Sequence, residues 1–283
     1  MTDSNSGITQ EMAKTMGITV LPMPFMINDE TFFEDISLKQ DEFYEKLEGG
    51  ANIATSQPSP ADVLKHWDDL LDTYEEIVYI PMSSGLSGSY ETARMLSMEE
   101  PYEGRVFVVN NQRISVTQKQ SVEDTRKLAE AGYTGAEILN ILENDKYNSS
   151  IYIMLNTLEY LKKGGRITPA AAALGTLLKI RPVLQIQGEK LDAFAKARTS
   201  AQGKKIMMNA IANDISTRFG GAKAGVNIAV AYTKDREPAH LLAEELKAEF
   251  PEHEILIAPL ALSIACHIGP GSLAIAVTGE MAV

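Results

Sequence analysis

Residues 77–96 have the sequence IVYIPMSSGLSGSYETARML, and this stretch decides the fold class. The apolar, β-branched run at 77–80 is typical of a buried strand. A loop rich in serine and glycine follows at 83–89, and the next segment carries apolar residues at helical spacing. A strand, a polar loop and a helix in this order form the repeating unit of an α/β protein.

The same alternation extends over the rest of the chain. Further apolar runs of strand length lie between helical stretches, at residues 18–21, 106–109, 151–154, 228–232 and 255–258. Three helix starts are marked by a proline that follows a capping or acidic residue, at Ser59-Pro60, Thr168-Pro169 and Glu237-Pro238. The runs 183–186 and 190–194 predict a β-hairpin that turns at 187–189. The chain is therefore predicted to be an α/β protein.

A polar stretch at residues 145–150 precedes a fresh strand and marks a domain boundary. We predict two closely packed α/β domains, residues 1–148 and 149–283, with a ligand cleft between them. Only two residues precede the first polar loop, at 3–7, where a buried strand of about five residues is usual. The first strand is therefore predicted to be truncated.

The composition argues against several classes of function. Of the 283 residues, 45% are hydrophobic and 23% are charged, which is typical of a soluble globular chain. The net charge of −12, from 26 basic and 38 acidic residues, argues against a nucleic-acid groove and an anionic membrane surface, since both need a basic face. We expect no signal peptide, since the first residues are polar, and no apolar run reaches the ~20 residues that span a bilayer. We expect a cytoplasmic protein without stable membrane insertion.

Metal and disulfide chemistry are not expected either. Cys266 is the only cysteine, so it forms no intramolecular disulfide and no thiolate cluster. The four histidines are scattered without the spacing of a metal site, at His66, His240, His253 and His267. The sequence thus predicts no metal and no cofactor.

Three loops share a composition of hydroxyls and glycines with little charge, and each is expected after a strand or before a helix. They cover residues 55–60, 83–89 and 267–272. Glycines let the main chain approach a ligand, and main-chain N–H groups at a helix start favour an anion. None of the loops carries arginine or lysine, so hydroxyls and one histidine would suit a single carboxylate better than a phosphate. The alternative is that these residues only cap helices and form turns.

A hydrolase or transferase is a further alternative, with Ser87 as nucleophile and His267 as base. Residues 85–89 nearly match the nucleophile motif G-x-S-x-G, but Ser89 stands where the last glycine belongs. No third catalytic residue stands out along the chain, so this alternative is the weaker one.

Five motifs, taken in order, resemble the DegV family of bacterial fatty-acid-binding proteins over nearly the whole chain. They are Thr2-Asp3-Ser4, Thr55-Ser56-Gln57-Pro58-Ser59, residues 83–89, residues 158–167 and His267-Ile268-Gly269-Pro270-Gly271. The sequence departs from the family's pattern at two points. The first strand is truncated, and Ser89 stands where threonine is common. Any one motif is weak evidence, but five in the same order and spacing are specific.

The resemblance implies two α/β domains with one long-chain fatty acid in a buried tunnel between them. It implies that the carboxylate is held by Thr55, Ser56, Ser84 and Ser87 and reached by His267. It further implies a carrier without catalytic residues of its own. Such a carrier presents the fatty acid to a separate ATP-dependent kinase, which makes the acyl phosphate that enters phospholipid synthesis.

Two arginines are assigned to the partner rather than to the lipid. Arg166 follows the glycine pair of Lys162-Lys163-Gly164-Gly165, and in the family the arginine of this motif is associated with docking to the kinase. Arg198, near Lys204 and Lys205, extends the positive region. The purely structural alternative is that the lysines complement a helix dipole and the glycines end the helix.

Overall fold

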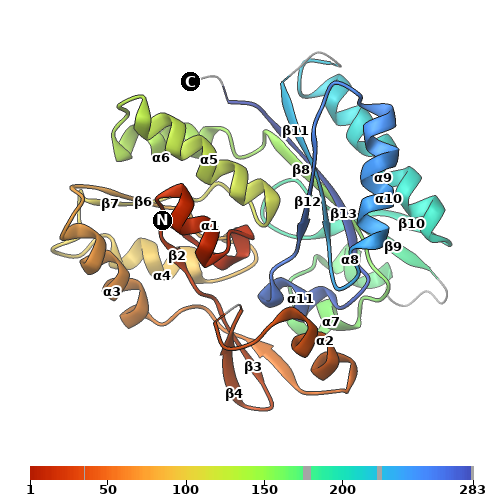
Figure 1. Ribbon diagram of the computed structural model, residues 1–283, viewed down its shortest axis with the longest axis horizontal. Helices are drawn as coiled ribbons and strands as arrows, with labels where there is room; N and C mark the ends of the chain where they lie inside the picture. Colours follow the sequence, from red (N-terminus) through yellow and green to blue (C-terminus); the bar gives the residue numbers. More distant parts are fainter. Residues whose placement is uncertain (35, 175–179, 222–224, 282–283) are drawn as a thin grey trace.

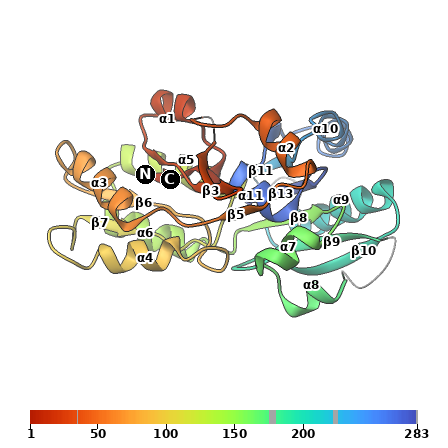
Figure 2. The ribbon, with the colours of Figure 1, turned by 90° about the horizontal axis from the view of Figure 1, so that it is seen from below.

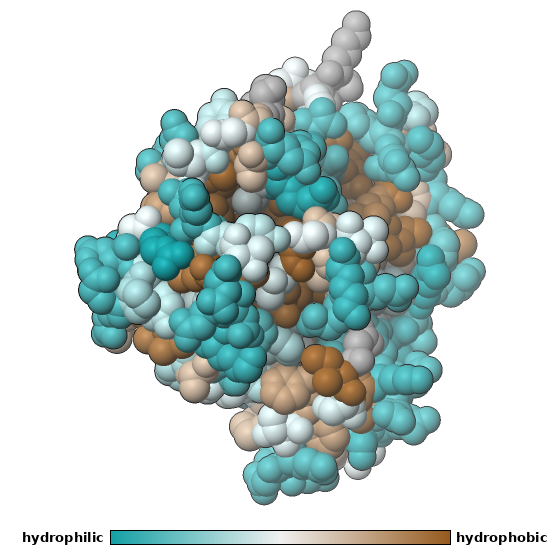
Figure 3. All heavy atoms as spheres, turned by 60° about the vertical axis from the view of Figure 1, so that its left-hand side comes forward, coloured by the Kyte–Doolittle hydropathy of each residue, from teal (hydrophilic) through white to brown (hydrophobic). Residues whose placement is uncertain are grey.

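The protein is an α/β structure with two main sheets and a small third sheet beside their junction (Figures 1 and 2). The computed structural model describes residues 1–34, 36–174, 180–221 and 225–281. The face shown in Figure 3 is largely hydrophilic, and hydrophobic residues are visible mainly in its hollows.

The first half of the chain forms a parallel layer of four short strands. Their order is β2 (Val20–Leu21), β1 (Thr2–Asp3), β6 (Ile77–Tyr79) and β7 (Val106–Val108). A parallel bridge between Thr2 and Ile80 joins the two strand pairs. β1 has two residues.

Helices cover both faces of this layer. On one face, α3 (Pro60–Leu71) and α4 (Ser89–Leu96) bury Trp67 against Tyr79 and Tyr102. The other face is covered by α1 (Gln10–Met16), α5 (Val116–Glu130) and α6 (Gly135–Asn144). The predicted start of α3 is confirmed, because Ser59 Oγ accepts the Asp62 N–H at 3.1 Å.

The second half forms a six-stranded mixed sheet. The strand order is β10 (Asp192–Ala197), β9 (Arg181–Ile186), β8 (Ser149–Met154), β13 (Leu273–Gly279), β11 (Val226–Tyr232) and β12 (Ile255–Pro259). β11 and β12 are parallel and the other pairs are antiparallel. The predicted hairpin is β9 and β10, and the predicted starts at Thr168 and Glu237 begin α8 (Pro169–Leu174) and α10 (Glu237–Glu249).

The two faces of this sheet carry side chains of different size. α9 (Ser200–Thr217) and α10 pack on a face of large residues such as Tyr152, Ile228 and Ile275 (Figure 1). On the opposite face the two neighbouring strands β11 and β13 carry four alanines, Ala229 and Ala231 of β11 and Ala274 and Ala276 of β13, whereas β8 and β9 carry leucine and isoleucine. The alanines lie on the side of the first half of the chain.

A three-stranded antiparallel sheet was not predicted. It has the order β4 (Glu30–Phe33), β3 (Pro24–Ile27), β5 (Ile53–Thr55) and packs with α2 (Gln40–Glu48) and α11 (Leu262–Ile268) around Phe25 and Phe43. Because α11 comes from the end of the chain, this cluster ties the two halves together. All strands after residue 148 join the six-stranded sheet. The exact division at residue 148 stays a prediction.

Candidate ligand-binding site

A cavity of about 170 Å³ lies where the loops of the first half meet α11 and α7 (Glu159–Gly164). Its lining combines polar side chains with a larger share of apolar ones. Four of the five residues expected to hold a carboxylate line it, namely Thr55, Ser56, Ser87 and His267. Ser84, the fifth, is not among the described residues of the lining.

Thr55 and His267 are brought together from opposite ends of the chain. Thr55 is the last residue of β5, and its Oγ1 lies 2.8 Å from Nε2 of His267. His267 lies in the last turn of α11, which ends before Gly269 at φ +72°. The expectation of a loop after a strand or before a helix was therefore wrong for this motif, because residues 269–272 connect a helix to strand β13.

The His267 ring packs directly on the main chain at Gly164. A Cβ atom at position 164 would lie 2.4 Å from Nδ1 of His267, which is too close for any side chain. The glycine of the Gly164-Gly165 motif is therefore needed for this contact, in addition to its role at the end of α7.

The imidazole of His267 is neutral at pH 7. Burial lowers its pKa to about 4, and the positive charge of Arg166 lowers it further in the same direction. In a neutral imidazole one ring nitrogen donates and the other accepts, so the pair with Thr55 is a neutral hydrogen bond. A carboxylate entering the cavity here would meet neutral donors and one guanidinium.

The two serine-rich loops are held in place by buried contacts. The carboxylate of Asp3, fully buried, accepts the Met82 N–H at 2.8 Å, and burial raises its pKa. Gln57 Nε2 donates to Thr92 Oγ1 at 2.8 Å, which links the loop after β5 to helix α4. Asp3 of the Thr2-Asp3-Ser4 motif thus positions the loop that carries Ser87.

The serines of these loops differ in their surroundings. Ser87 Oγ lies 2.8 Å from Ser89 Oγ and accepts the Ser89 N–H, so part of its hydrogen-bonding capacity caps α4. Ser56 Oγ donates to the Gln57 carbonyl at 3.2 Å. The pairing required of a hydrolase does not form, because Ser87 is bonded to Ser89 and His267 to Thr55.

The two arginines assigned to a partner lie in different places. Arg166 lines the cavity, and its guanidinium donates to the main-chain carbonyls of Leu86 and Gly164. Arg198 is exposed just after β10 and is not part of the lining. From the sequence, Arg166 was assigned to a partner rather than to the lipid, whereas the structure places it in the wall of the cavity.

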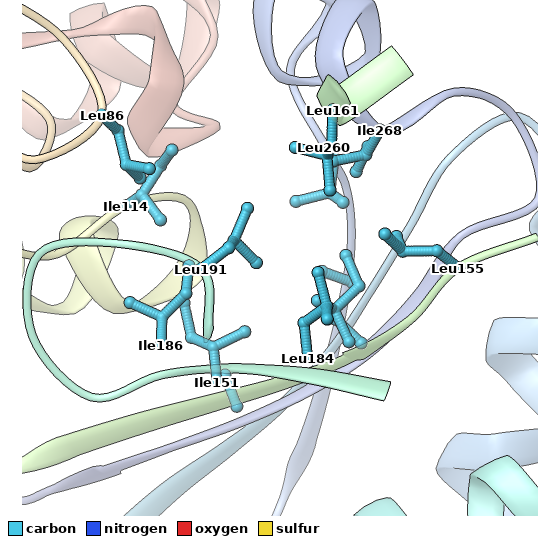
Figure 4. Close-up of a cluster of buried hydrophobic side chains, with 14 of the residues drawn as sticks. Leu86, Ile114, Ile151, Leu155, Leu161, Leu184, Ile186, Leu191, Leu260 and Ile268 are labelled. Carbon is cyan, nitrogen blue, oxygen red and sulfur yellow. The ribbon is translucent and has the colours of Figure 1, made fainter. Parts of the chain in front are cut away.

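Next to the cavity lies an apolar space of about 50 Å³, over the alanine face of the sheet. The two spaces share Leu86, Ile114, Leu191, Ile264 and Ile268. In Figure 4 the labelled leucines and isoleucines surround this open space from the first half, from α11 and from the six-stranded sheet. Leu191, directly before β10, closes one side.

Two residues of the cavity wall, Asn5 and Ser263, were not predicted from the sequence. Ser263 Oγ donates to Asn5 Oδ1 at 2.6 Å, and both side chains belong to the cavity wall. Asn5 follows the Thr2-Asp3-Ser4 motif directly, so the motif itself was the available signal. Ser263 had no such signal, because α11 had not been predicted.

The amino-acid sequence matches the family described as "Uncharacterised protein, DegV family" over residues 1–280. The chain belongs to the DegV family. A DegV domain-containing protein of Streptococcus pyogenes is 29% identical to it over 288 residues, covering 99% of this chain and 98% of that protein. The protein DegV of Bacillus subtilis is 28% identical over 278 residues, covering 97% and 96%.

Solved structures of DegV proteins have the same fold. A DegV family protein from Thermus thermophilus, whose structure is described as showing fatty acid binding, superposes with a TM-score of 0.89 at 28% identity and covers 99% of this chain. DegV from Bacillus subtilis, described as a fatty acid binding protein, gives a TM-score of 0.86 at 27% identity and the same coverage. Each match covers 98% of the other chain. The predicted α/β fold class and the family resemblance are confirmed.

Among the described residues, no helix is both long and apolar enough to cross a membrane. Within the same residues, no three or more histidine, cysteine, aspartate or glutamate side chains gather where a metal ion could be held.

Proposed function

We propose that this DegV-family chain binds one long-chain fatty acid, with the carboxylate beside Thr55, Ser87 and His267 and the acyl chain over the alanine face of the sheet. The observation that carries the proposal is that the cavity lined by these hydroxyls and His267 shares leucine and isoleucine side chains with an apolar space over the sheet. The fatty acid binding described for the Thermus thermophilus and Bacillus subtilis proteins supports it.

The energetics favour a lipid whose tail supplies the affinity. Each methylene that leaves water gains on the order of 0.8 kcal/mol, so a sixteen-carbon chain gains roughly 11 kcal/mol before ordering costs. The carboxylate must find partners, because an unpaired buried charge is very costly. Hydroxyls and the neutral His267 hold it with few charges, and Arg166 supplies one positive charge nearby.

We further propose that the chain is a carrier that presents the carboxylate to a separate ATP-dependent kinase. In that step a carboxylate oxygen attacks the γ-phosphorus of the ATP held by the kinase, the bond to the β-phosphate oxygen breaks, and ADP leaves. The product is an acyl phosphate that remains on the carrier. Arg166 and Arg198 are proposed to contact the kinase, and no catalytic group of this chain is required.

Native purification followed by solvent extraction and mass spectrometry tests the binding proposal. We expect close to one equivalent of long-chain fatty acid per chain. Extraction of no fatty acid, together with failure of the lipid-free protein to bind palmitate, would reject it. Turnover of ester substrates by the lipid-free protein would instead favour the hydrolase alternative.

A further inference from the structure

The cavity of about 170 Å³ is called the ligand-binding cavity below. Another cavity, of about 350 Å³, adjoins it on the side of α7 and β5. We call it the outer basin. It shares Thr55, Arg166 and His267 with the ligand-binding cavity, so the two spaces meet at the proposed carboxylate position. The rest of its wall is Leu47, Gly50, Ala51, Asn52, Ile53, Ala54, Tyr160, Lys163, Gly164 and Cys266.

The residues that line the outer basin carry a net positive charge, although the whole protein is acidic. Its wall carries two cations, Lys163 and Arg166, and none of its described residues is an aspartate or glutamate. The whole chain has a net charge of −12, so this local balance is the reverse of the average. Lys163 forms no ion pair among the described residues, and its ammonium is free to meet a ligand.

Both cations lie next to residues that surround the proposed carboxylate position. Lys163 lies in the last turn of α7, directly before Gly164, which packs on the His267 ring. The Arg166 guanidinium is held by the carbonyls of Leu86 and Gly164 and lowers the pKa of His267, which places its charge near the imidazole.

We propose that the outer basin binds the phosphoryl group of a long-chain acyl phosphate whose acyl chain occupies the ligand-binding cavity. This inference rests on the proposed function and adds a site for its product. A single carboxylate needs only the hydroxyls, His267 and one cation. A phosphoryl group adds further negative charge and three acceptor oxygens, which a second cation beside an open basin can meet.

Calorimetric titration of lipid-free protein tests this directly. The two probes are palmitate and the β-ketophosphonate analogue of palmitoyl phosphate, in which a methylene group replaces the bridging oxygen. Lys163→Ala is expected to weaken binding of the analogue by about fivefold at low salt, because one exposed charge contact is lost, and to leave palmitate unchanged. Lys163→Arg restores binding of the analogue.

Lys162→Ala is the matched control, since Lys162 is the adjacent exposed lysine and does not line the basin. Equal binding of the analogue by wild type and Lys163→Ala would overturn the inference, and so would equal losses of palmitate and analogue. A wild-type protein that does not bind palmitate would reject the proposed function instead. The phosphoryl site would fall with it only if the analogue also failed to bind.

Discussion

At the residue scale, the hydroxyls that line the cavity already have partners within the protein. Thr55 is bonded to His267, and Ser87 to Ser89. A hydroxyl has one donor and two acceptor positions, so each can accept a hydrogen bond from its partner and donate its own hydrogen to a carboxylate. The hydroxyls of Thr55 and Ser87 are therefore two neutral donors available to a carboxylate.

Ser87→Ala and Thr55→Ala are each expected to weaken fatty acid binding by roughly 1–3 kcal/mol, since each would remove a proposed, partly buried hydrogen bond to the carboxylate. Ser84→Ala is the matched control from the same loop, because Ser84 does not line the cavity. Palmitate affinity, measured by titration of lipid-free protein, checks this. Full affinity in the Thr55 and Ser87 double variant would remove both residues from the site.

His267 is expected to make stability depend on pH. Its pKa is about 4 in the folded protein and 6.5 in the unfolded chain. Between these values the unfolded chain binds a proton that the folded protein does not, so stability is intact above pH 6.5 and falls as pH decreases toward 4. From pH 7 to pH 5 the loss from this group is up to about 2 kcal/mol.

Urea unfolding at both pH values, on wild type and His267→Gln, measures this contribution. Other titrating groups are common to the two proteins and cancel in the comparison. We expect the wild type to lose more stability than His267→Gln on going to the lower pH. The same loss in both proteins would mean that His267 is not held neutral by the fold.

Side-chain direction limited what the sequence could predict about the site. Thr55, Ser56, Ser87 and His267 line the cavity as a set, but Ser84 does not, although it lies in the same loop as Ser87. Irregular loops have no periodicity from which the direction of a side chain can be deduced. Arg166 was assigned to a partner because sequence spacing does not reveal that it turns back to Leu86, 80 residues earlier in the chain.

At the element scale, the central strands of the six-stranded sheet provide space for a ligand by the choice of side chain on one face. Ala231 pairs with Ala274, and Ala229 with Ala276, in directly opposed positions. Three of these, Ala231, Ala274 and Ala276, line the apolar space. The other face of the same strands carries large residues that pack on α9 and α10.

Ala274→Leu is expected to occupy the apolar space and to lower palmitate binding. The lipid-free variant should unfold at the same or a higher urea concentration than wild-type protein, because the new side chain fills an existing void. Ile275→Val, on the opposite face, is the control and should cost about 0.5–1.5 kcal/mol of stability while palmitate binding is kept. Normal palmitate affinity in Ala274→Leu would show that the acyl chain does not run over these strands.

Elements with strong local signals were predicted, and those that depend on distant partners were not. The Ser59-Pro60 start and the β9–β10 hairpin have capping or turn residues that act locally. β3 and β4 also had a local signal that was overlooked, since Asn28 and Asp29 form a two-residue turn with φ of +49° and +67°. β5 had none, because Ile53–Thr55 is a strand only through its pairing with β3.

At the scale of the whole molecule, a net charge of −12 makes any positive region stand out as a surface for a negatively charged partner. Arg198 is exposed after β10, and Arg166 lies at the two cavities. Because Arg166 lines the ligand-binding cavity, its substitution would affect the lipid as well as a partner. Arg198 therefore gives the cleaner test of kinase docking.

Arg198→Ala is expected to raise the KM of an ATP-dependent fatty acid kinase for the lipid-loaded carrier by about threefold at low salt, because one exposed charge contact is lost. The kcat for acyl-phosphate formation and the fatty acid content should not change. Raising the salt concentration should reduce the difference between variant and wild type, since ions screen contacts between exposed charges. Arg236→Ala, at another exposed arginine, is the control. An unchanged KM at every salt concentration would exclude Arg198 from docking, and loss of the bound lipid would show that Arg198 acts on the carrier itself.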